Sequence, residues 1–430
     1  MAAPNHHARA ILDRILRQRT AAEAFADFKP RRGDEEPLPP RLSGTNDYSA
    51  AAVDERRQLL AAAGISTAQL AGEQDEIAPS ALAGNIENFI GFARLPIGVI
   101  GPLRVNGIYA HGDFYVPMAT SEGALVASYH RGAYLISQCG GATVACLTES
   151  VSRAPCFVFD SLIESGQFLA WVLPRFEQLQ QVVAQTTRHG RLIDLKVSVL
   201  GKEVYLILEF HTGDAAGQNM VTLSTDAVVA TILAECPQQP QHWFLDGNLS
   251  GDKKATAAAF TTARGKKVVG EAVIDRKMVR RFLHTEPEQM VRYWQISVLG
   301  GVQSGSIGVQ GHYANAVAAL FIACGQDAAC VAEAAVGVTR MDVTAAGDLY
   351  TSVSMPNMIV GTVGGGTRLP TAQECLAMVD CVGDGKAAKF AEICCATVLA
   401  GEISIIGAMS AGDFGQAHAK YGRRTQKPEA

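Results

Sequence analysis

Residues 213–220, GDAAGQNM, form a turn whose backbone could bind an anion. They follow KVSVLGKEVYLILEF, where apolar residues recur at about every second position, and they precede VTLSTDAVVATILAEC, where the spacing is helical. Small residues leave the backbone accessible, and the first N–H groups of a helix attract negative charge. The turn therefore suits a cofactor that carries a pyrophosphate, although an ordinary helix start capped by Asp214 fits the same spacing.

Three other stretches place ionisable side chains where they could do chemistry. GNLSGDKKA holds Lys253 and Lys254 in a glycine-containing turn, although adjacent lysines usually mark a solvated loop. Asp327 falls inside an apolar run, 304–336, that is predicted to be helical, so its carboxylate must be paired or neutral. Glu122 is predicted at the first turn of a helix, where a favourable interaction with the helix dipole is the simpler explanation for a lone glutamate.

The elements that must position these residues group into four predicted regions. These are an N-terminal helical arm (1–84), a large domain in two pieces (85–154 and 245–405), a small domain inserted between them (155–244) and a mobile C-terminal flap (406–430). Within the arm, 8–28 and 51–64 have helical spacing, and the proline-rich segment 29–44 is typical of a linker or extended arm.

The small domain is predicted to have the element order βαββα. CFVFD is typical of a strand, 165–185 is mostly helical, and 191–200 and 203–210 form a strand pair that turns at Gly201. This order predicts a ferredoxin-like layer within an α+β chain, and it is not the GxGxxG pattern of a Rossmann fold.

Composition excludes several classes of function. A net charge of −5 gives no reason to expect a nucleic acid partner. The 10 cysteines have no C-x-x-C or paired metal spacing, so reduced core thiols of a cytoplasmic protein without a metal are expected. The longest uncharged stretch, 293–326, is rich in Gly, Ser and Gln, so no membrane span is expected.

Further motifs surround the turn at 213–220. In chain order they are ENFIGFARLPIGVIGPL (87–103), PMATSEGALVAS (117–128), GNLSGDKKA (247–255), ACGQDAA (323–329), GTVGGGTRLP (361–370) and AGDFGQAHAKYGR (411–423). From about residue 80 to about 423, the chain resembles the soluble catalytic portion of the hydroxymethylglutaryl-CoA reductase family. GDAAGQNM is similar to the cofactor motif of that family, with Ala216 in place of the usual methionine.

The resemblance implies the four-electron reduction of a thioester to a primary alcohol by two molecules of NADPH in turn. Lys253 would stabilise the oxyanion, and Asp327 would orient Lys253 and couple it to Glu122. Glu122, with a pKa raised by burial, would supply the proton of the alcohol. His418 would protonate the coenzyme A thiolate, although a surface histidine in a tail is the alternative.

The resemblance also implies two sets of binding residues and a shared site. The cofactor set is Arg188, Asp214, Ala216, Gly217, Gln218 and Asn219; the substrate set is Ser128, Arg131, Arg153, Asn248, Lys254, His312 and Asn315. Arg188 suits the 2′-phosphate of NADPH, although a solvated loop arginine fits as well. The partners expected are an acyl-CoA substrate and a second copy of the chain, in a homodimer or a dimer of dimers.

Two departures from the family pattern concern the acyl group. Asp246 stands where a serine is frequent, and the region that often carries a lysine reads YWQISVLGG, with Ile296 or Ser297 at that place. Both changes weaken recognition of an anionic acyl group. The expected function is reduction of hydroxymethylglutaryl-CoA to mevalonate. A reductase of another acyl thioester is the first alternative, and a non-catalytic relative is the second.

Overall fold

The computed structural model describes residues 6–17, 19–42, 47–73, 77–262 and 264–412. Helices and strands are mixed, and the sheet is open and largely antiparallel, so the predicted mixed α and β class is confirmed at that level. Ten strands of the described residues join in one sheet, in the order β7-β4-β6-β3-β8-β10-β9, with β1 beside β2 and β3, and β5 beside β6.

Strand β3 (Ala142–Arg153) connects the two ends of this sheet. Its residues 143–150 pair with β8 (Gly265–Ile274), and its last three residues pair with β6 (Glu203–His211). On the β8 side the sheet continues through β10 (Leu349–Met358) to β9 (Val338–Val343), while β1 (Ile97–Gly107) and β2 (His111–Ala119) form a hairpin beside β3.

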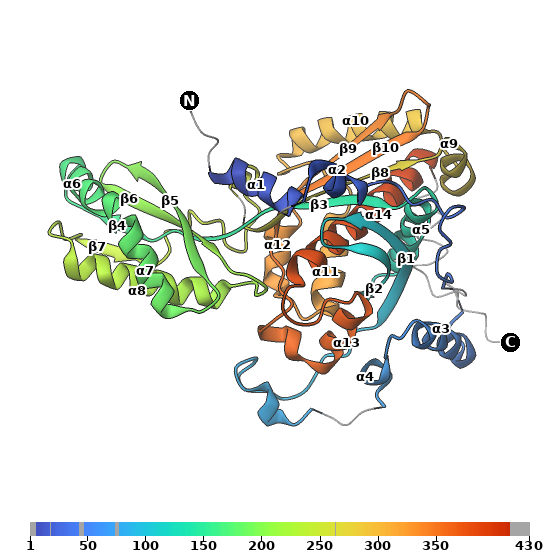
Figure 1. Ribbon diagram of the computed structural model, residues 1–430, viewed down its shortest axis with the longest axis horizontal. Coiled ribbons are helices and arrows are strands. Elements are labelled where there is room, and N and C mark those ends of the chain that lie inside the picture. Colours follow the sequence, from blue (N-terminus) through green and yellow to red (C-terminus); the bar gives the residue numbers. More distant parts are fainter. Residues whose placement is uncertain (1–5, 18, 43–46, 74–76, 263, 413–430) are drawn as a thin grey trace.

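Residues 156–244 gather at one end of the molecule, at the left of Figure 1. The strands β4 (Cys156–Val158), β5 (Arg191–Leu200), β6 and β7 (His242–Phe244) pair antiparallel in the order β7-β4-β6-β5, and the helices are α6 (Leu162–Val172), α7 (Phe176–Thr186) and α8 (Gln218–Glu235). The predicted strand pair is confirmed. Its turn uses Gly201 at φ +64°, a conformation in which glycine avoids strain.

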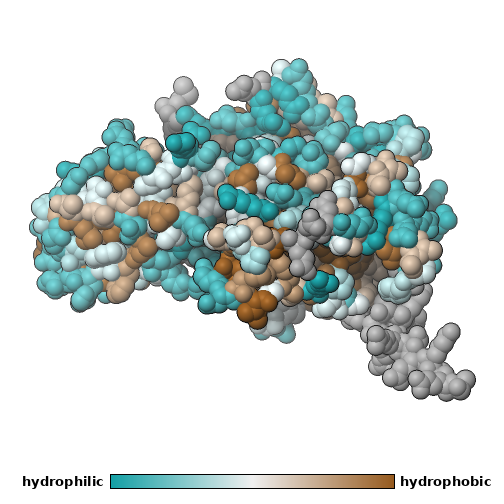
Figure 2. All heavy atoms as spheres, turned by 90° about the horizontal axis from the view of Figure 1, so that it is seen from below, coloured by the Kyte–Doolittle hydropathy of each residue, from teal (hydrophilic) through white to brown (hydrophobic). Residues whose placement is uncertain are grey.

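Helix α14 (Ala387–Ala411) is the core of the rest of the molecule. It packs against α5 (Leu125–Gln138) so closely that a Cβ on Gly132 would lie 1.8 Å from the Ala400 carbonyl oxygen. By length and composition α14 could cross a membrane, but 83% of its apolar window is buried inside the protein, so packing explains its composition. On the face shown in Figure 2, hydrophobic residues lie in separate patches among hydrophilic ones.

The N-terminal arm differs from its prediction in one helix. The expected helix over 8–28 is two helices, α1 (His6–Leu16) and α2 (Ala21–Ala26), because Thr20 starts α2 with a capping box that includes Glu23. The second predicted helix is confirmed as α3 (Ala50–Ala62), and α4 (Ala68–Ala71) follows it. Between α2 and α3 the chain is fixed to β1, because buried Arg104 donates hydrogen bonds to the carbonyls of Arg31, Glu36 and Pro37.

The single helix predicted over 304–336 is wrong. Helix α10 (Pro287–Ser304) ends at Gly305, α11 (Tyr313–Ala323) follows a loop, and α12 (Val331–Ala334) follows a second break. Glycines at positive φ, Gly305, Gly308 and Gly325, turn the chain at these breaks.

The remaining helices and turns are short. They are α9 (Arg276–Met278), α13 (Pro370–Met378), the 3₁₀ turns Pro79–Leu82, Leu173–Arg175, Ala257–Phe260, Ala328–Cys330 and Gly365–Arg368, and one π-helical turn, Val279–Leu283.

Candidate active site

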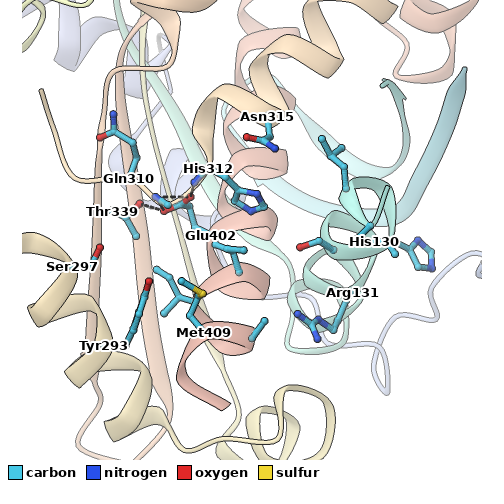
Figure 3. Close-up of a pocket in the computed structure, with 18 of the residues that line it drawn as sticks. His130, Arg131, Tyr293, Ser297, Gln310, His312, Asn315, Thr339, Glu402 and Met409 are labelled. Carbon is cyan, nitrogen blue, oxygen red and sulfur yellow. Dashed lines mark hydrogen bonds between the residues drawn. The ribbon is translucent and has the colours of Figure 1, made fainter. Parts of the chain in front are cut away.

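A cavity of about 550 Å³ lies between α5, α10, α14 and the segment before α11. Five predicted site residues line it: Glu122, Ser128, Arg131, His312 and Asn315. Its wall is otherwise rich in apolar and aromatic side chains, among them Tyr293, Trp294 and Met409 (Figure 3). A concave cavity that combines apolar and aromatic walls with polar groups is typical of a site for a small organic ligand.

Glu122 lies in the turn before α5, and not in its first helical turn as predicted, because Ala124 at φ +71° precedes the helix. Its carboxylate accepts a hydrogen bond of 2.8 Å from the Asn315 side chain. Glu122 is exposed, so the burial that its predicted role requires is absent from a single chain. The structure thus unites Glu122 with Asn315, two residues that are far apart in sequence.

The floor of the cavity contains Glu402, a fully buried carboxylate that the sequence interpretation missed. It accepts hydrogen bonds from the Gly311 and His312 N–H groups, both at 2.8 Å, and from the Thr339 hydroxyl at 2.7 Å (Figure 3). These donors stabilise the charge without a cation. The available signal was a glutamate within an apolar helical run, the same signal that singled out Asp327.

Glu402 also fixes the segment that carries His312. The Nε2 atom of His312 lies 2.9 Å from the carbonyl oxygen of Gly401. Since a carbonyl oxygen only accepts, Nε2 must carry the hydrogen, and Nδ1 of a neutral ring is then an acceptor. On the other wall, hydrogen bonds join α5 to α14. The hydroxyl of Ser128 and the Nε of Arg131 each lie 3.0 Å from the hydroxyl of Ser404.

A second group of predicted residues lies outside this cavity. Lys253 Nζ lies 2.8 Å from the Asp327 carboxylate, so the predicted pairing is present. The hydrogen bond that Lys253 donates to Asp327 raises the pKa of Lys253. Partial burial of Asp327 opposes its ionisation, but hydrogen bonds from Lys253 and the Ala329 N–H outweigh burial and hold its pKa below the ordinary value. Both groups are therefore charged at neutral pH.

Charged residues surround this pair. Arg153, expected to bind a substrate carboxylate, donates to Asp246 at 2.8 Å and to Asp252 at 2.9 Å. Lys254 is exposed and donates to the Asp252 carbonyl. The backbone N–H of exposed Asn248 donates to Asp246.

Two buried residues near Lys253 were missed by sequence reasoning. Arg264 and Glu333 form an ion pair of 2.7 Å, and Glu333 also accepts a hydrogen bond from the Lys253 N–H at 3.3 Å. Neither residue belongs to a motif with recognisable spacing. Their only signal was charge in otherwise apolar or glycine-rich surroundings.

The turn at 213–220 has a different capping pattern from the one that its spacing suggested. Helix α8 begins at Gln218 after Gly217, and the Asp214 carboxylate accepts hydrogen bonds from the Gly385 and Ala387 N–H groups, at 2.7 and 3.0 Å. The alternative that Asp214 caps its own helix is therefore wrong, because Asp214 satisfies the start of α14. Ala216 packs against Gly361, where a Cβ would lie 2.6 Å from the Ala216 nitrogen.

The residues around the start of α8 fit an anionic cofactor. The side-chain nitrogen of Gln218 is buried and lacks a hydrogen-bond partner within the described residues. Arg188 is exposed on the loop 187–190, and that loop contacts Met220 in the first turn of α8 through the Thr187 hydroxyl. Asn219 is exposed beside them. The first turn of α8 thus carries a donor amide at the helix N-terminus, and it contacts the loop that carries Arg188.

A single chain does not unite the two groups of predicted catalytic residues. Glu122 meets Asn315 at the first turn of α11, whereas Asp327 lies beyond its last residue. A helix of 11 residues is roughly 16 Å long. His418 lies outside the described residues, and α14 runs past residue 405, where the tail was predicted to begin.

Comparison with known proteins identifies the family. The family model described as hydroxymethylglutaryl-coenzyme A reductase matches residues 52–423. The chain belongs to the hydroxymethylglutaryl-coenzyme A reductase family.

Named members of the hydroxymethylglutaryl-coenzyme A reductase family are similar over most of the chain. The 3-hydroxy-3-methylglutaryl-coenzyme A reductase of Methanocaldococcus jannaschii is 42% identical over 80% of this chain and 86% of that protein. The enzyme of Pyrococcus abyssi is 43% identical over 81% and 87%, and that of Aeropyrum pernix 45% over 79% and 82%.

A solved structure shows the same fold. It is the class II 3-hydroxy-3-methylglutaryl-CoA reductase from Streptococcus pneumoniae bound to NADPH, with a TM-score of 0.68 and 18% identity over 83% of this chain and 96% of that chain.

Proposed function

We propose that the chain reduces hydroxymethylglutaryl-CoA to mevalonate and coenzyme A, with oxidation of two molecules of NADPH and uptake of two protons. Membership of the reductase family supports this reaction. The observation that carries it is the Lys253–Asp327 ion pair at 2.8 Å, because it keeps an ammonium group in place beside an acid partner. A fixed cation is what a thioester carbonyl needs when it becomes an oxyanion.

Each protein group has one task in this reaction. Lys253 binds the carbonyl oxygen and stabilises the negative charge that develops on it, first in the hemithioacetal oxyanion and then in the alkoxide formed when the aldehyde is reduced. Glu122 delivers the proton that the second reduction requires, and Asn315 holds its carboxylate. His418 protonates the departing coenzyme A thiolate, which would otherwise attack the aldehyde again.

The cofactor proposed is NADPH, which supplies hydride when bound. Residues 155–244 would act as an inserted, ferredoxin-like cofactor domain, a proposal supported by the antiparallel order β7-β4-β6-β5 with helices between the strands. Gln218 and the start of α8 would bind the pyrophosphate, and Arg188 would bind the 2′-phosphate. Residues 85–154 with 245–405 would form the substrate domain.

A complete site would need a second copy of the chain. Glu122 and the Lys253–Asp327 pair follow opposite ends of α11, so Glu122 of one subunit would face Lys253 of the partner subunit in a homodimer or dimer of dimers. The N-terminal arm (1–84) would lie against the partner. The ten cysteines are free and buried, which suits a reducing, cytoplasmic compartment.

Subunit mixing tests the shared site. Glu122→Gln and Lys253→Met are each expected to abolish turnover alone. Coexpression would form mixed dimers in which one of the two sites has both native residues, so about a quarter of the wild-type activity should return. No recovery in verified mixed dimers would contradict the shared site.

A reductase of another acyl thioester is the second candidate. It is favoured by Arg153, whose guanidinium binds Asp246 and Asp252 of the protein itself. The decisive measurement is NADPH oxidation with hydroxymethylglutaryl-CoA, acetyl-CoA and other acyl-CoAs, followed by mass spectrometry of the product. Mevalonate with the highest kcat/KM supports the main proposal, whereas faster turnover of an uncharged acyl-CoA supports the second.

A further inference from the structure

Arg264 is a buried guanidinium whose hydrogen bonds reach four separate segments. It is 2% exposed, and its Nε donates to Glu333 at 2.7 Å. One Nη donates to the carbonyl of Ser152, and the other donates to Asp252 at 2.7 Å and to Gln218 at 3.2 Å. Residues this far apart in sequence meet at one side chain because guanidinium presents several donors in a fixed plane.

Two of these partners control the backbone around Lys253. Asp252 directly precedes Lys253, and the second oxygen of Glu333 accepts the Lys253 N–H at 3.3 Å. Lys253 itself has φ +55°, the left-handed region that residues other than glycine rarely adopt. Such a conformation persists only when the surrounding contacts hold it. Arg264 anchors the side chains that make those contacts.

The other two partners of Arg264 belong to β3 and α8. Ser152 lies at the end of β3 beside Arg153, and Gln218 is the first residue of α8. The Gln218 amide oxygen accepts from Arg264, so the amide nitrogen, a buried donor with no partner in the part of the chain that the structure describes, points away from the guanidinium. Arg264 therefore orients a donor at the start of α8 and the loop of Lys253 at once.

We propose that Arg264 is a positioning residue, which holds Lys253 against Asp327 and aligns the start of α8 with that pair. It does not touch the reacting atoms. The inference rests on the proposed role of Lys253, and it assigns a task to a residue outside every motif recognised in the sequence.

Arg264→Lys is the primary test. Lysine keeps one positive charge but cannot direct planar donors to Glu333, Asp252, Gln218 and the Ser152 carbonyl together. We expect kcat for hydroxymethylglutaryl-CoA to fall about 100-fold, since small misplacement of a reacting group has costs of that order, with a much smaller change in its KM. Wild-type kcat in the folded variant would overturn the proposal.

A direct readout of Lys253 separates positioning from general loss of structure. Amine acylation followed by mass spectrometry compares Lys253 with Lys202, an exposed lysine in the turn between β5 and β6 that serves as an internal reference. In Arg264→Lys, the labelling of Lys253 relative to Lys202 should increase, because the ammonium group is no longer held by Asp327. An unchanged ratio would mean that Arg264 does not position Lys253.

Three other variants serve as a control, a replacement and a reference for this test. Arg276→Lys is the matched control, because Arg276 also pairs with two glutamates, Glu286 and Glu288, away from Lys253; it should retain wild-type kinetics. If Arg264→Lys fails to fold, Glu333→Gln replaces it, and unchanged kcat there overturns the inference. Lys253→Met is the reference for the proposed function: if it keeps full turnover, the role of Lys253 is wrong, whatever Arg264 does.

Discussion

The two halves of the candidate site hold their carboxylates in opposite ways. In the cavity, Glu402 is stabilised by backbone N–H groups and one hydroxyl, and its hydrogen-bond partners among the described residues include no cation. Around Lys253, Glu333 and Asp252 are stabilised by the cation Arg264. Backbone donors stay in place when side chains change, whereas each ion in a network depends on its partner.

This difference shows which half tolerates change. The cavity can vary its lining while Glu402 keeps its donors, so contacts with a ligand can change there at low risk to the fold. In the Lys253 half, removal of one charge leaves another buried charge without compensation. That half is therefore expected to be sensitive in both activity and stability.

The largest effect should come from the reacting cation. Lys253→Met is expected to lower kcat for hydroxymethylglutaryl-CoA by about 1,000-fold, because the oxyanion loses its principal stabilising charge. Lys254→Met, at the exposed neighbour, should cost far less. Steady-state NADPH oxidation at saturating substrate checks both, and equal losses would remove the distinction between the two lysines.

A pair of isosteric substitutions compares the two halves in stability. Glu333→Gln should lower the free energy of unfolding by about 3 kcal/mol, because Arg264 loses a buried counter-ion. Glu402→Gln should lower it by about 1.5 kcal/mol, since only charge-assisted hydrogen bonds weaken. Urea unfolding measures both, and a greater loss in Glu402→Gln would reverse the comparison.

A smaller effect is expected from Asp246, whose carboxylate binds Arg153, the residue proposed to bind the carboxylate of the substrate. Asp246→Ser frees part of the Arg153 guanidinium, so KM for hydroxymethylglutaryl-CoA should fall about tenfold, which corresponds to about 1.4 kcal/mol. KM for acetyl-CoA, which lacks the terminal carboxylate, is the control and should not change. A lysine added at Ser297 would enter the cavity, whereas Ile296 is exposed on α10.

The smallest effect concerns the stability supplied by the Lys253–Asp327 pair itself. Both side chains are more than 40% exposed, so solvent screening limits the contribution to less than about 1 kcal/mol. Because the pKa of Asp327 is lowered on folding, this stability is present above the unfolded pKa of about 3.9 and is lost as pH falls through the lower folded value. Asp327→Asn should thus differ slightly from the wild type in unfolding free energy at pH 7, and the difference should shrink as pH falls below the unfolded pKa.

Local patterns predicted the elements that local forces determine. The β5–β6 hairpin follows from strand alternation and Gly201, whereas the pairing of Lys253 with Asp327 was implied by the family resemblance and not by any local pattern. The single helix over 304–336 was wrong because apolar composition masked the glycine turns. The Arg264 network was not predictable, since its partners lie up to 112 residues away and no periodicity relates them.

The bond between Asp214 and the start of α14 limits how this chain can be recombined with its relatives. Asp214 supplies an acceptor to the N–H groups of residues 385 and 387, while the far end of the same 25-residue helix lines the cavity. A chimaera that imports residues 155–244 without an acceptor at position 214 would leave those N–H groups without their hydrogen-bond acceptor. It would thereby destabilise the start of a helix roughly 37 Å long. The exchangeable unit is therefore the turn together with the helix start that it caps.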